Sequence, residues 1–153
     1  MRDKRFIAEH RGGPLKKEQH YMLIKWAYDS SKHVLHLYGR IDERLTNALI
    51  VAKKWQYGDI SVGEARKVSL DAIAVANESS NLTKISVARS VGHAVATAHM
   101  ADHSLGAALY ALKAVKSAGG SIYREIQWQN NQIPIQIKEL IVTARDAEKF
   151  RKI

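Results

Sequence analysis

The alanine-rich stretch at residues 88–115 constrains the fold more than any other part of the chain. It contains nine alanines, two glycines and three of the seven histidines, namely His93, His99 and His103. Alanine has the highest helix propensity, and its small side chain lets neighbouring helices approach closely. The stretch therefore predicts the tightly packed centre of an all-helical fold, with a histidine cluster in or beside it.

Apolar residues recur at helical spacing along most of the remaining chain, and strict alternation typical of strands is missing. We expect an all-α, single-domain bundle of about six or seven helices over residues 1–153. A turn at 101–102, with Asp102 as N-cap, is favoured over one unbroken helix from 82 to 117, because such a helix would be unusually long. The expected helices cover 15–38, 42–58, 61–76, 82–100, 102–117, 121–131 and 134–144.

The two ends of the chain differ from this helical pattern. Residues 1–13 are expected to form an amino-terminal arm anchored by Phe6 and Ile7, which ends at Gly12-Gly13 before Pro14, a natural first-turn residue of a helix. Residues 146–153 are expected to form a charged tail.

Composition excludes several classes of site. The chain has no cysteine, so disulfides, thiolate metal ligands and cysteine nucleophiles are excluded. Its sequence contains no stretch resembling a secretory signal and no apolar run long enough to span a bilayer. These features predict a cytoplasmic protein without membrane contact.

The net charge of +9 is concentrated towards the ends of the chain. Residues 1–32 carry eight Lys and Arg against four Asp and Glu, residues 113–153 carry the same numbers, and residues 33–112 carry eight against seven. The basic ends are compatible with an acidic partner, with nucleic acid, or with an ordinary solvated surface. No RNA-binding motif supports nucleic-acid binding, which we keep as an alternative function.

His93, His99, Asp102 and His103 are the candidate metal or ligand residues. On a continuous helix His99 and His103 would lie about 40° apart on one face. Zinc sites usually need three or four ligands, however, and the HExxH motif of metalloproteases would need glutamate where Met100 stands. If the chain turns near Asp102, we expect the histidines to be structural.

The sequence gives little support to other catalysis. It has no Gly-x-Ser-x-Gly elbow, no P-loop and no dinucleotide-binding glycine pattern. We therefore expect no cofactor and no enzymatic activity, and keep a metal- or ligand-binding enzyme at the histidine cluster as a further alternative.

Several segments together resemble a bacterial family of immunity proteins. They are RFIAEHRGGPL, the Trp26-Ala27 helix, AKKWQYGDISVGEAR and VGHAVATAHMADHSLGAALYALKA, in that order. The resemblance implies an all-helical fold and neutralisation of a toxin by direct protein–protein contact. It carries over no catalytic or binding residues. Immunity proteins against nucleases are often acidic, so the charge of this basic chain fits an acidic toxin, or no toxin at all, better than a nuclease.

A binding protein of this kind should expose an apolar or aromatic patch, and we expect Trp128, Tyr123 or the amino-terminal arm to contribute to it. A homodimer is compatible with the alanine-rich helices, because they can pack within one subunit or between two.

Overall fold

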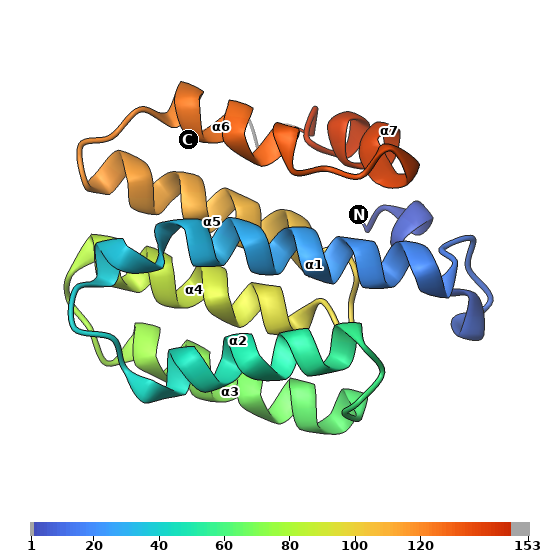
Figure 1. The fold of residues 1–153 in the computed structure, drawn as a ribbon, viewed down its shortest axis with the longest axis horizontal. Coiled ribbons are helices and arrows are strands. Elements are labelled where there is room, and N and C mark those ends of the chain that lie inside the picture. Colours follow the sequence, from blue (N-terminus) through green and yellow to red (C-terminus); the bar gives the residue numbers. More distant parts are fainter. Residues whose placement is uncertain (1, 148–153) are drawn as a thin grey trace.

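A computed structural model describes residues 2–147, and in this part of the chain seven α-helices are joined by short connections (Figure 1). The all-α prediction is confirmed. The helices are α1 (Lys17–Val34), α2 (Glu43–Gln56), α3 (Val62–Asn77), α4 (Leu82–Ala96), α5 (His103–Ser117), α6 (Ile122–Asn131) and α7 (Ile135–Ala144). Short 3₁₀ helices lie at Lys4–Phe6, Glu9–Arg11 and Leu35–Tyr38.

Helices α1, α4 and α5 form the centre of the molecule, α2 and α3 cover one side, and α6 and α7 cover the other (Figure 1). At the contact of the three central helices lie Ala27, Ala94 and Ala107, none of which is exposed to solvent. Small side chains at this point allow the close approach that the alanine-rich stretch predicts.

Serine hydroxyls link the same three helices. Ser31 on α1 donates to the carbonyl oxygen of Ser90 over 2.9 Å, and Ser90 on α4 donates to the carbonyl of Ala107 over 2.7 Å. All three residues are fully buried, so these bonds satisfy hydroxyl groups that would otherwise be costly to bury. The Asp29-Ser30-Ser31 segment lies within a continuous α1.

Local capping signals place most helix ends. Asp42 and Ser61 accept hydrogen bonds from the first turns of α2 and α3, and Gly58 ends the α2 segment with a φ of 76°. Two predicted ends were wrong. The first α-helix stops at Val34 and tightens into a 3₁₀ helix, and α4 stops at Ala96 rather than Met100.

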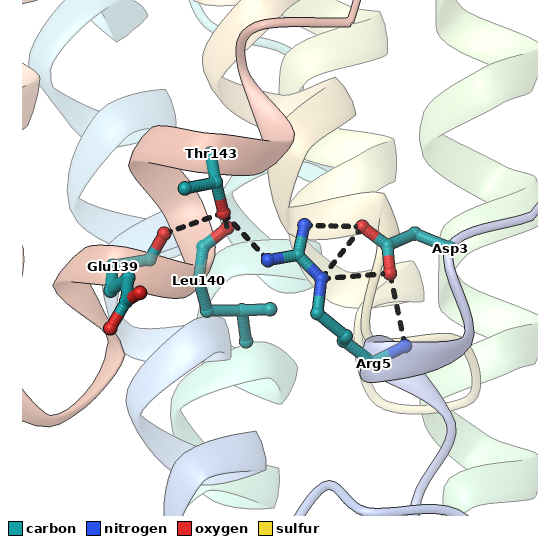
Figure 2. Close-up of polar contacts among 5 residues, drawn as sticks. All are labelled: Asp3, Arg5, Glu139, Leu140 and Thr143. Atoms are coloured by element: carbon teal, nitrogen blue, oxygen red, sulfur yellow. Dashed lines mark hydrogen bonds and ion pairs between the residues drawn. The ribbon is translucent and has the colours of Figure 1, made fainter.

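The amino-terminal arm packs against α7 (Figure 2). The Phe6 side chain is fully buried in a hydrophobic cluster that includes Ile137 and Ile141. The Arg5 guanidinium is paired with Asp3 at 2.7 Å and donates to the Thr143 hydroxyl at 2.6 Å. The arm thus closes one end of the bundle. The expected charged tail lies outside the described residues from position 148 onward.

The arm turns sharply at its two glycines. Gly12 has a φ of 84°, which favours glycine, and a Cβ on Gly13 would lie only 2.1 Å from the Ile7 carbonyl oxygen. This close approach lets Ala8 and Leu15 form an isolated parallel bridge. No other β-structure occurs in residues 2–147.

Candidate functional site

Three of the sequence-predicted site residues meet at the corner between α4 and α5. His93 lies on α4, His103 begins α5, and His99 lies in the turn between them. The Nδ1 atoms of His93 and His103 are 2.9 Å apart, and the rings of His99 and His103 are 5.4 Å apart between centroids. One of the two facing Nδ1 atoms must carry a proton and donate a hydrogen bond, and the other must be unprotonated and accept it. Two neutral imidazoles meet this requirement.

The surroundings of these histidines disfavour their charged form. Burial lowers the pKa of His93 to about 4, and the neighbouring His103 and Arg89 act in the same direction. Burial is also the largest cause that lowers the pKa of His99 and His103. Near neutral pH the cluster is therefore uncharged.

Asp102 lies at the N-cap position of α5, but its side chain makes no capping hydrogen bond. Its Oδ2 is 3.6 Å from Arg2 Nε, while Oδ1 is buried without a hydrogen-bond partner among the described residues. The Nδ1 atom of His99 is also buried without a hydrogen-bond partner among the described residues. The turn thus brings the predicted histidines and Asp102 close together, but hydrogen bonds do not connect all of them.

A cleft of about 270 Å³ opens beside the cluster. It is lined by His93, Met100, Asp102, His103, Gly106, Leu109 and Tyr110. The Tyr110 ring stacks on His93 at 5.2 Å and carries Arg89 and Lys113 close to its faces. Within residues 2–147 no three His, Asp or Glu side chains are arranged to hold a metal ion. The cleft thus combines apolar walls with two neutral imidazoles and one carboxylate, and the chemistry these polar groups offer is hydrogen bonding.

The contacts of His33 on α1 with Glu125 and Trp128 on α6 were not predicted from the sequence. His33 Nδ1 lies 2.7 Å from the Oε2 atom of Glu125, a carboxylate that is only 7% exposed. The His33 ring also stacks on Trp128 with 3.5 Å between centroids and 3° between planes. His33 lies in the last turn of α1, and its main contacts are with α6. No local signal connects residues 92 positions apart.

The exposed outer faces of α1 and α2 form a mixed aromatic and basic surface. Tyr28 has Lys32 and Lys53 over its ring at 5.7 and 5.6 Å, and Tyr57 and Ile50 are 65% and 50% exposed. A shallow groove of about 280 Å³ runs here, lined by Tyr28, Ile50, Lys53, Lys54, Tyr57 and Asp59. We call Tyr28, Lys32, Ile50, Lys53 and Tyr57 the Tyr–Lys surface.

The predicted aromatic patch is only partly where the sequence placed it. Tyr123 is 70% exposed on α6, but Trp128 is half-buried against His33, and Phe6 of the arm is fully buried. Ile135 at the start of α7 is 78% exposed. Apolar side chains therefore reach solvent on both outer layers of the bundle.

The fold defines an all-helical protein without a recognisable catalytic constellation in the part of the chain described. The chain belongs to the family described as Imm-5 like putative immunity protein, whose profile matches residues 13–136. The match covers all of α1 to α6, the histidine cluster and the Tyr–Lys surface. No curated protein and no solved structure matches the chain. Among the described helices, none combines the length and apolar character needed to cross a membrane.

Proposed function

We propose that this protein neutralises a toxin by direct protein–protein contact in the cytoplasm of a bacterial cell, without catalysing a reaction. Membership of an immunity-protein family supports this role. The single structural observation that carries the binding site is the Tyr–Lys surface, where exposed Lys32 and Lys53 lie over the half-buried Tyr28 ring and the Tyr57 and Ile50 side chains beside them are exposed. Tyrosine is enriched at binding hot spots, because its ring provides a large, rigid contact area and a polar hydroxyl.

The charge of this surface favours an acidic partner. Lys32 and Lys53 are exposed on either side of Tyr28, and Lys54 lines the same groove. Asp59 is the one acidic residue among the described groove-lining side chains. Lysines at the rim of an interface accelerate association with an acidic surface and select against basic ones. We therefore propose a toxin whose contact face is acidic.

The test begins with affinity capture from lysate of the native host after nuclease treatment, at two salt concentrations. A captured protein is then purified and its affinity measured for the wild type and for Tyr57→Ala and Lys53→Glu. We expect each substitution to weaken binding by about tenfold or more, and the loss with Lys53→Glu to shrink at high salt. Coexpression should also relieve the growth arrest that the captured protein causes alone.

Tyr123→Ala is the matched control, because Tyr123 is as exposed as Tyr57 but lies on α6. Unchanged binding in this variant is expected. If Tyr123→Ala alone weakens binding, the interface lies on the α6–α7 side and the proposed surface is wrong. If recovery disappears with nuclease, binding to nucleic acid replaces the immunity proposal.

A further inference from the structure

Arg145, the C-cap residue of α7, has an unusual environment for a charged side chain. Its guanidinium carbon lies 5.0 Å from the centre of the Trp26 ring, which is almost completely buried. Nη1 donates a hydrogen bond to Asn130 Oδ1 at 2.9 Å, and Nη2 donates to Gln129 Oε1. The side chain thus reaches from α7 across the carboxyl end of α6.

All of these acceptors are electrically neutral. Among residues 2–147, no carboxylate lies within ion-pair distance of the Arg145 guanidinium. Burial lowers the pKa of Arg145 to about 10, which still leaves the side chain charged at neutral pH. Arg145 is half-buried, and a charge partly removed from water is stabilised by a counter-ion, because amides and an aromatic face replace only part of its hydration.

Arg145 also lines a cavity of about 250 Å³ between α5, α6 and α7. The lining residues are Leu109, Leu112, Ile126, Asn130, Val142, Arg145 and Asp146. Four of the seven are aliphatic, so most of the wall is suited to a hydrocarbon. The cavity is smaller than the 300–1,000 Å³, roughly, that drug-sized ligands occupy.

We propose that this cavity binds a small carboxylic acid with an aliphatic body, whose carboxylate pairs with Arg145. Only two of the five guanidinium N–H groups are used in the hydrogen bonds described above. The planar guanidinium matches a carboxylate in shape and charge. Asp146, also on the lining, disfavours a more highly charged anion such as a phosphate ester. This site is separate from the Tyr–Lys surface and does not depend on the proposed immunity function.

The test compares octanoate with 1-octanol, which has the same hydrocarbon chain and no charge, by isothermal titration calorimetry of the full chain. We expect octanoate to bind at least about tenfold more tightly than octanol, as a charged hydrogen-bonded pair requires. Arg145→Gln should remove this preference. Arg124→Gln is the matched control, because Arg124 is an exposed arginine on α6, outside the cavity lining.

A second variant covers the case in which Arg145→Gln fails to fold. Val142 lies on the cavity wall and is 43% exposed, so Val142→Trp should fill the cavity while Arg145 is retained. We expect octanoate affinity to fall about tenfold or more in this variant. In the wild type, octanoate should also shift the ¹⁵N resonance of Arg145 Nε. Equal binding of octanoate and octanol, no binding of either, or wild-type affinity in Val142→Trp would overturn the proposal.

Discussion

Gly106 shows how one missing side chain sets the geometry of the histidine cluster. A Cβ at this position would lie 2.7 Å from His93 Nδ1, closer than real Cβ contacts allow. The His93 ring is held between His103 and Tyr110, so it has little room to move aside. Glycine inside a helix normally lowers stability, and here the close approach of α5 to α4 explains its presence.

We predict that Gly106→Ala destabilises the protein by about 1–3 kcal/mol, because overpacking outweighs the gain in helix propensity. Gly63→Ala is the control. Gly63 lies in the exposed first turn of α3, where an added Cβ would meet only the Ser61 hydroxyl at 3.9 Å. This second change should leave stability the same or raise it by up to about 1 kcal/mol. Urea unfolding of both variants measures the difference, and a fully stable Gly106→Ala would show that His93 moves freely.

At the scale of single elements, the amino-terminal arm holds α7 against the bundle. Phe6 supplies the buried contact. Arg5, Asp3 and Thr143 form an exposed polar group between the arm and α7 (Figure 2). Burial of a large aromatic side chain contributes far more to stability than an exposed ion pair does. The arm is therefore held mainly by Phe6.

We predict that Phe6→Ala lowers the free energy of unfolding by about 3–5 kcal/mol, the usual loss for a buried phenylalanine. Hydrogen exchange should speed up first in α7, because that helix loses part of its hydrophobic support. Arg5→Gln is expected to cost about 1 kcal/mol or less. A Phe6→Ala variant that exchanges as slowly as the wild type in α7 would contradict the proposed role of the arm.

Helix positions were predictable because their signals are local. Asp42 and Ser61 each cap a helix whose first residue follows directly in sequence, and the turn before Asp102 was favoured from helix length alone. The His33–Glu125 pair was not predictable, since it depends on how α1 and α6 pack. The candidate histidines were found by their clustering in sequence. The hydrogen bond between His93 and His103 and the partial burial of the histidines depend on the turn between α4 and α5, which brings these residues together.

At the scale of the whole molecule, buried histidines make stability depend on pH. The pKa values of His20, His93, His99 and His103 all lie below the ordinary value of 6.5 in the folded protein, with burial as the largest cause. The unfolded chain then binds protons at a higher pH than the folded protein does. Stability is complete above about pH 6.5 and falls as the pH falls towards 4.

We predict that lowering the pH from about 7.5 to about 5 reduces the free energy of unfolding, with His93 alone accounting for on the order of 2 kcal/mol. Urea unfolding at several pH values measures this loss. His93→Gln should have a shallower pH dependence than the wild type, whatever its stability at pH 7.5. Parallel curves for the two proteins would show that His93 titrates normally.

The junction between the arm and α7 also has a consequence during protein synthesis. A ribosome makes Phe6 long before it makes Ile137 and Ile141, the α7 residues that help to cover Phe6. At typical elongation rates the delay is on the order of ten seconds. During this interval the hydrophobic cluster around Phe6 lacks Ile137 and Ile141, and the apolar surface left uncovered is a natural contact for chaperones. Final closure of the bundle is thereby timed to the emergence of α7 from the exit tunnel.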